Sequence, residues 1–154
     1  MAATTISAMY TNLRKLIKGL EPDGAALGGE AKYKRAAEKH SWDEPPRSAS
    51  DWDRRFTVHD LARGTPLNFG SPDEYDYDGT FRVSIGHVIT DKESEGQTRR
   101  DTDAFQIAEE LEKSSNFPSG VSLIRYMDKT ILKYSPEHWL TTLVFEIHFS
   151  AAAP

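Results

Sequence analysis

The chain has 154 residues and a net charge of −5, from 24 Asp and Glu against 19 Lys and Arg, and it contains no cysteine. Its length suits one domain, so we expect a single domain over residues 1–154. The lack of cysteine excludes disulfide scaffolds, thiolate metal sites and cysteine nucleophiles. The acidic balance argues against a nucleic-acid coat or a membrane-surface binder, and no apolar run approaches the ~20 residues of a membrane-spanning helix. We therefore expect a soluble cytosolic protein without a signal peptide.

Residues 5–20 carry the clearest helical pattern. Their apolar side chains recur every three or four positions and form one stripe of a helix: Ile6, Met9, Tyr10, Leu13, Leu16, Ile17 and Leu20. Pro22 and Gly24 end the pattern. We expect this helix to pack on a sheet, and a membrane-surface helix or a transit peptide is the alternative.

Residues 21–53 predict a long loop, because Gly, Pro and Ser interrupt every periodic pattern in them. Within this segment, residues 30–40 are charged and contain Ala, which predicts a short exposed helix. Trp42 and Trp52 are the two tryptophans of the segment. Such residues anchor many subunit or partner interfaces, so both are candidate interface residues. The alternative is that they fold back over the edge of the core.

Alternating apolar and polar residues predict strands at 54–61 and 80–90. Gly and Pro predict a loop over residues 62–79, and the polar residues 91–100 predict a second, exposed loop. Gly86 is typical of a β-bulge, because the apolar alternation blurs after it.

Residues 101–115 predict a second helix with a buried stripe: Ala104, Phe105, Ile107, Ala108 and Leu111. Short strands are expected at 121–127 and 130–134, around a bend at Asp128 and Lys129. Residues 139–150 alternate over their whole length and predict the clearest strand. We expect its odd-numbered side chains to meet the helices: Trp139, Thr141, Leu143, Phe145, Ile147 and Phe149.

This order of elements predicts an α+β fold. We expect a mostly antiparallel or mixed β-sheet of about four strands, with two helices packed on one face and long loops. The leading helix, the loop segment 21–53 and the core over residues 54–150 are parts of the same domain.

The sequence contains no recognisable catalytic motif. None of the five histidines has an H-x-x-x-H or H-E-x-x-H spacing, and nucleophile-elbow, P-loop and dinucleotide-binding patterns are absent. Glu146 and His148 share one face of the last strand and could ligate a metal, but a polar pair on a half-exposed face is the interpretation we favour. We expect no catalytic residues, no metal site and no cofactor.

An acidic stretch occupies the middle of the chain, with carboxylates at Asp73, Glu74, Asp76 and Asp78. Aligned on its glycine, it resembles a calcium loop, but Ile85 takes the position where a bidentate Glu is needed. A solvated acidic loop is one interpretation. The other is that repeated copies of the loop line a negatively charged pore or meet a partner.

From Arg54 to Ser150, the order of the elements and their residue patterns resemble those of the tail terminator, or tail completion, proteins of long-tailed bacteriophages. The segments that carry the resemblance are FTVHD, FRVSIGHVI, DAFQIAEEL, VSLIRYMD and WLTTLVFEIHF. Residues 5–20 correspond to the leading helix of that family, and the long segment 21–53 departs from its pattern. Head-completion and neck proteins have a similar layout.

The resemblance implies a structural virion protein of the tail or neck, assembled in the host cytoplasm, rather than an enzyme. Such proteins form a ring, usually of six subunits, that caps the tail tube, stops its polymerisation and presents a surface to the neck or connector proteins. DNA passes through the ring without specific binding. Two other classes stay open: a small ligand- or peptide-binding module that uses Trp42 and Trp52, and a small hydrolase or transferase with a site among His59, His87 and the acidic loop.

Overall fold

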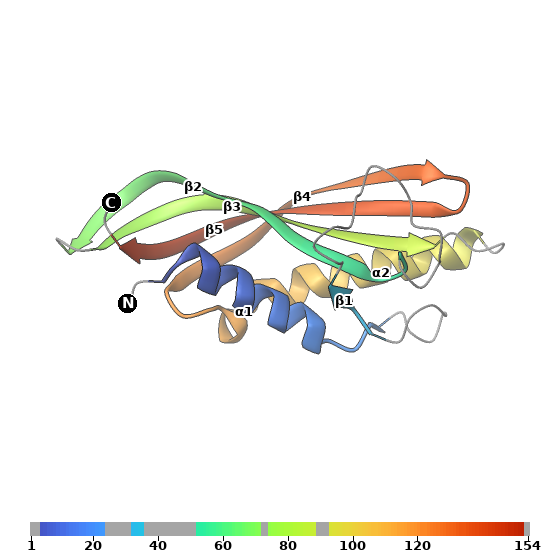
Figure 1. The fold of residues 1–154 in the computed structure, drawn as a ribbon, viewed down its shortest axis with the longest axis horizontal. Helices are drawn as coiled ribbons and strands as arrows, with labels where there is room; N and C mark the ends of the chain where they lie inside the picture. Colours follow the sequence, from blue (N-terminus) through green and yellow to red (C-terminus); the bar gives the residue numbers. More distant parts are fainter. Residues whose placement is uncertain (1–3, 24–31, 36–51, 72–73, 89–92, 153–154) are drawn as a thin grey trace.

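Both α-helices lie on one face of a five-stranded sheet (Figure 1). This computed structural model describes residues 4–23, 32–35, 52–71, 74–88 and 93–152. The predicted α+β class is confirmed, and the sheet has one strand more than the four expected. The elements are α1 (Ile6–Gly19), β1 (Lys34–Arg35), β2 (Arg55–Ser71), β3 (Glu74–Val88), α2 (Glu93–Glu112), the 3-10 helix η3 (Ser114–Asn116), β4 (Val121–Ser135) and β5 (His138–Ala152).

The strands lie in the order β1-β2-β3-β5-β4, so β1 and β4 form the two opposite edges of the sheet. All pairs are antiparallel except the short β1–β2 pair. In Figure 1 the β2–β3 hairpin reaches one end of the molecule and the β4–β5 hairpin reaches the other. Helix α1 packs mainly beneath β2, and α2 packs beneath β4 and β5.

Helix α1 forms as the sequence predicts. The Thr5 side chain caps it, because its Oγ1 accepts a hydrogen bond from the Ala8 N–H over 3.1 Å. Met9, Leu13 and Ile17 are fully buried against the sheet. The apolar stripe therefore faces the core and fixes α1 on the sheet.

The first long hairpin is longer than expected. Strand β2 continues to Ser71 and β3 begins at Glu74, so the loop predicted over residues 62–79 is wrong wherever the structure describes it. Pro66 is tolerated in β2 because β1 pairs only with Arg55 and Phe56, and no other described strand pairs with the outer edge of β2. Several register shifts between β2 and β3 absorb the irregular residues.

The segment before β2 also differs from expectation. The helix predicted over residues 30–40 is wrong at β1, and residues 24–31 and 36–51, including Trp42, lie outside the described residues. Tyr33 is buried and its hydroxyl donates to Gln106 Oε1 over 2.8 Å. Gln106 Nε2 in turn donates to the Glu21 carbonyl. These bonds hold residues 21–23 and 32–35, two of the three described parts of the 21–53 segment, against α2.

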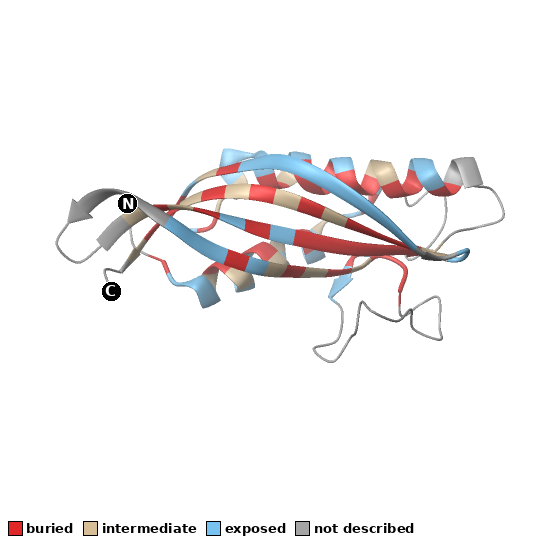
Figure 2. Ribbon diagram, turned by 90° about the horizontal axis from the view of Figure 1, so that it is seen from above, coloured by how far each residue is buried: buried red, intermediate tan, exposed pale blue. Residues whose placement is uncertain are grey.

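The second hairpin confirms the prediction for the last strand. Odd-numbered residues of β5 are buried towards the helices, and the even-numbered ones from Thr142 to His148 are half-buried on the other face (Figure 2). The two strands predicted at 121–127 and 130–134 are one strand, β4. A register shift between Tyr126 and Asp128 replaces the predicted bend.

Helix α2 starts at Glu93, so the exposed loop predicted over residues 91–100 is wrong within the helix. Ala104, Ile107, Ala108 and Leu111 are buried as expected. Phe105 is not: 70% of its surface is exposed. The buried stripe follows the i, i+3, i+4 positions of Ala104, and the adjacent Phe105 points about 100° away from it.

Candidate functional site

The acidic stretch lies in a strand, not in a loop. Asp76 and Asp78 are half-buried in β3, while Tyr77 between them is buried against Phe149 on the helix face. Asp76 accepts a hydrogen bond from the Ser150 hydroxyl. Both carboxylates therefore belong to the face of the sheet that the helices leave open. Asp73 lies outside the described residues, and Glu74 begins β3 opposite Ala152.

Trp52 is fully buried within the chain, the second of the two arrangements expected from the sequence. Its Nε1 donates to the Trp139 carbonyl over 2.8 Å, and its ring meets His138 edge-on at 5.3 Å. A Cβ on Gly86 would lie 2.6 Å from the Trp52 carbonyl oxygen. Gly86 is therefore needed for this close approach, and the bulge predicted there is wrong because the β3–β5 register runs through it without a shift.

A buried ionic cluster joins α2 to the sheet. Arg54 Nε donates to Asp103 Oδ2 over 2.7 Å, and His87 Nε2 lies 2.7 Å from the same oxygen. All three side chains are fully buried. Burial raises the pKa of the Asp103 carboxyl, but hydrogen bonds from His87 and Arg54 outweigh burial and hold that pKa below its usual range.

A second buried pair lies beside the first. Arg99 NH2 is 3.2 Å from Asp53 Oδ1 and donates to the Val88 carbonyl over 2.7 Å, while the Val88 N–H donates to Asp53. Arg54 itself has a positive φ of 53°. The two clusters fasten the start of β2, the end of β3 and α2 together. Arg54 and Arg99 are each paired with a carboxylate inside the protein, whereas Arg99 Nε and His87 Nδ1 are buried without a hydrogen-bond partner among the described residues.

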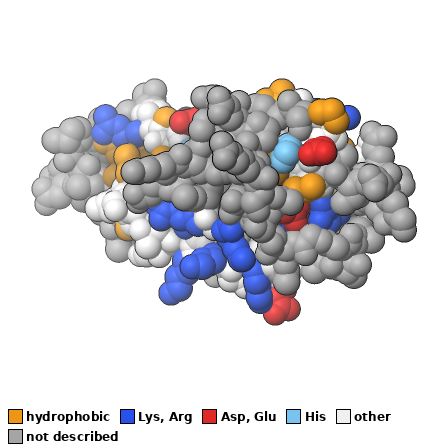
Figure 3. Space-filling view, turned by 45° about the vertical axis from the view of Figure 1, so that its right-hand side comes forward, with side chains coloured by type: hydrophobic (Ala, Val, Ile, Leu, Met, Phe, Trp, Pro, Cys, Tyr) orange, Lys and Arg blue, Asp and Glu red, His pale blue; other side chains and the backbone are white. Residues whose placement is uncertain are grey.

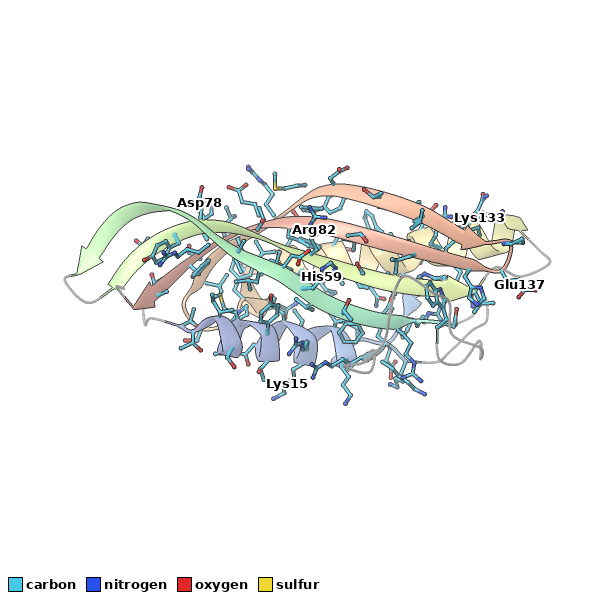
Figure 4. The ribbon with its side chains drawn as sticks, turned by 45° about the horizontal axis from the view of Figure 1, so that its top comes forward. Lys15, His59, Asp78, Arg82, Lys133 and Glu137 are labelled. Atoms are coloured by element: carbon cyan, nitrogen blue, oxygen red, sulfur yellow. The ribbon has the colours of Figure 1, made fainter. Side chains whose placement is uncertain are left out.

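The open face of the sheet is polar along its centre. His59 Nε2 lies 2.8 Å from Ser84 Oγ, which is 2.9 Å from Thr142 Oγ1. Glu146 pairs with Arg125 and, over 2.9 Å, with His148 Nε2, so the predicted same-face pair of Glu146 and His148 is confirmed. Figure 4 shows His59, Arg82 and Asp78 along this face and Lys15 on the helix layer behind it.

The residues considered for an enzyme site do not converge. His59 lies on the open face, His87 is buried between sheet and α2, and Asp76 and Asp78 lie towards the β2–β3 end. Ser84, the hydroxyl next to His59, is buried in the central strand β3. Within the described ranges, no group of three His, Asp or Glu side chains could hold a metal ion.

The side of the molecule formed by α2 and β4 is apolar and hollowed. A cavity of about 450 Å³ lies between them, with Ala108 and Leu143 in its floor and Phe105 and Tyr126 at its walls. Phe105 and Tyr126 are exposed large hydrophobic residues of this cavity, and Ile131 of β4 is exposed on the same face of the sheet as Tyr126. Met127 and Leu132 of β4 are also exposed, but Met127 lines a hollow with Asp78 and Glu146, and Leu132 pairs with Leu140 on the open face. The sequence analysis missed this surface, because it placed Phe105 in the core.

Comparison with solved structures shows that the fold also occurs in a virion. No family model matches the chain, and no curated protein matches it. A chain from a structure titled "Virion of native gene transfer agent (GTA) particle" has a TM-score of 0.61 and 11% sequence identity. The match covers 97% of this chain and 100% of that chain, so the two share a fold. No described helix is long and apolar enough to cross a membrane.

Proposed function

We propose that the chain is a structural virion protein that forms a ring, of six subunits, at the end of a phage tail tube. The observation that carries the proposal is the fold shared with a chain of a gene transfer agent virion over nearly the whole of both chains. The tail-terminator resemblance of the sequence points in the same direction. The ring caps the tube, stops its polymerisation and presents a surface to the neck or connector proteins.

The two faces of the sheet support a place around a channel. The helix face is apolar and covered by α1 and α2 except at the groove beside β4, and the open face carries the polar residues Thr57, His59, Arg82, Thr142, Glu146 and His148. A polar face suits a water-filled lumen. Asp76 and Asp78 share this face, and like charges along a lumen would repel DNA phosphates and let DNA slide without binding.

The proposed role is structural and not enzymatic. His59 lies between a carboxylate and a hydroxyl, with Asp60 Oδ2 3.1 Å from its Nδ1 and Ser84 Oγ 2.8 Å from its Nε2. Ser84 is buried and its hydroxyl also lies 2.9 Å from Thr142 Oγ1, so this hydroxyl is not open to a substrate. Binding partners are further copies of the chain, the tail tube protein and the neck proteins.

The test is the position of the chain in particles. A tagged copy should be present in purified virions, and averaged density at the junction of tail and neck should contain a ring into which this fold fits. Density for the fold on the head side of the junction would favour a head-completion or neck protein. Virions without the chain would contradict the proposal.

A further inference from the structure

We propose that neighbouring copies join head to tail, with the basic flank of one copy seated on the groove between α2 and β4 of the next. The groove is the 450 Å³ cavity described above, and the basic flank comprises Arg14, Lys18, Lys34 and Arg35 of α1 and β1. This inference rests on the proposed ring and names the surfaces that build it.

The groove needs a cover. Strand β4 ends the sheet, and the side chains from Arg125 to Lys133 are exposed along it. Proteins usually protect so long an edge, and exposed apolar residues beside it mark an interaction surface. Phe105 of α2 and Tyr126 of β4 both line the groove and are both exposed, so each element directs an aromatic side chain to solvent there.

The chemistry of the groove selects a cationic side chain. Its floor is apolar, and Glu109 and Glu112 of α2 line it. Lys and Arg place their methylene groups on apolar surface while their charged ends meet carboxylates. Lys129 also lines the groove, but its ammonium group lies 3.6 Å from Asp101.

The basic flank lies at the edge of the sheet formed by β1, and the groove lies at the opposite edge, formed by β4. Helix α1 packs against β1 and β2, whereas α2 packs against β4 and β5. Lys18 and Arg35 are exposed there. Figure 3 shows Lys and Arg side chains gathered at the lower margin of the molecule, on the side where α1 and β1 lie in Figure 1.

Charge decides between the two ways in which copies can pair. In a two-fold pair, groove would face groove, and Glu109 of one copy would meet the groove carboxylates of the other copy, which costs free energy. In a head-to-tail pair, the acidic groove meets the basic flank. A contact between two different surfaces repeats from copy to copy and closes into a ring when the rotation allows.

Charge reversal tests this contact in solution by native mass spectrometry over a concentration series. Reversing the groove (Glu109→Lys with Glu112→Lys) or the flank (Lys18→Glu with Arg35→Glu) should each weaken assembly by about tenfold or more. An equimolar mixture of the two variants should restore it, because the basic groove of one meets the acidic flank of the other. The control is Arg82→Glu on the open face, which should leave assembly unchanged.

If the unchanged protein forms rings but the equimolar mixture of the two variants does not, the proposed contact is wrong, while the proposed ring is not contradicted. A protein that stays monomeric at every concentration would also overturn the contact. The presence of the chain at the tail end of virions tests the proposed function separately, since it does not depend on which surfaces touch.

Discussion

Arg54 donates a hydrogen bond from Nε to Oδ2 of Asp103 over 2.7 Å, and neither side chain is exposed to solvent. The two residues are 49 positions apart in the chain. The bond links the first residues of the sheet core to the middle of α2. It therefore holds α2 in place over β5, where the groove between α2 and β4 is formed.

Asp103→Asn should destabilise the protein by about 3–5 kcal/mol, because it leaves the Arg54 guanidinium buried without its counter-charge. The free energy of unfolding in urea measures this effect. Glu21→Gln is the control: it also removes one carboxylate charge, but Glu21 pairs with Lys32 at the surface, so its loss should cost less than about 1 kcal/mol. Equal effects of the two changes would mean that the Arg54–Asp103 pair does not hold the fold.

The Asp103 carboxyl should make the free energy of unfolding decrease as the pH falls. The pKa of Asp103 is lowered in the folded protein, where burial is outweighed by the bonds from His87 and Arg54. Its contribution is therefore present above the unfolded pKa of about 4 and is lost as the pH falls through the folded pKa.

Urea unfolding between neutral pH and pH 3 should show a steeper loss of stability for the unchanged protein than for Asp103→Asn. The comparison between the two proteins is needed because Glu146 and Glu110 also have lowered pKa values. Parallel curves for the two proteins would contradict the prediction.

The sequence predicted the elements whose signal is local. The sequence of β5 alternates between apolar and polar residues, and that of α1 has an apolar stripe with a period of 3.6 residues. Their buried faces could therefore be assigned from the sequence. Strand β2 beyond Leu61 could not be predicted, because Gly64 and Pro66 are typical of loops and their extended form depends on pairing with β3. Sheet pairing is a long-range interaction that local residue preferences do not report.

The polar core was missed for a related reason. Charged residues are expected at the surface, and nothing in the sequence joins Arg54 to Asp103. One signal was available: Asp103 lies four residues before Ile107 and eight before Leu111, which places it on the buried face of α2. Phe105 was assigned to the core by its hydrophobicity, although its helical position points away from Ala104 and Ile107.

The core contact between Phe145 and Phe81 should be essential for stability. Their rings stack at 5.0 Å, and both side chains are fully buried. Phe145→Ala should lower the free energy of unfolding by about 3–5 kcal/mol, a large part of the total for a domain of this size. Phe105→Ala makes the same chemical change at an exposed site and should cost less than about 0.5 kcal/mol. A melting temperature unaffected by Phe145→Ala would contradict the assigned face of β5.

The last prediction concerns the acidic stretch. Neutralising its carboxylates distinguishes a position in the lumen of the ring from a role as a docking surface. Asp76 and Asp78 share the open face of β3, and Asp73 and Glu74 precede them in the chain. In a ring, the stretch would be repeated around one opening and would repel DNA phosphates. Replacing all four carboxylates with Asn or Gln keeps the side-chain shape and removes the charge. We expect such particles to assemble normally and to release DNA more slowly.

Tail assembly, head joining and DNA ejection should be measured separately in these particles. Glu21→Gln serves as the control, because Glu21 is exposed and lies on the helix side of the sheet. Slowed ejection from intact particles would support a lumen position. Tails that fail to join heads would instead indicate that the carboxylates dock on a basic surface of an adjoining ring. Normal joining and ejection would show that the stretch is a solvated surface, because removing its charge would then change no step in which the ring takes part.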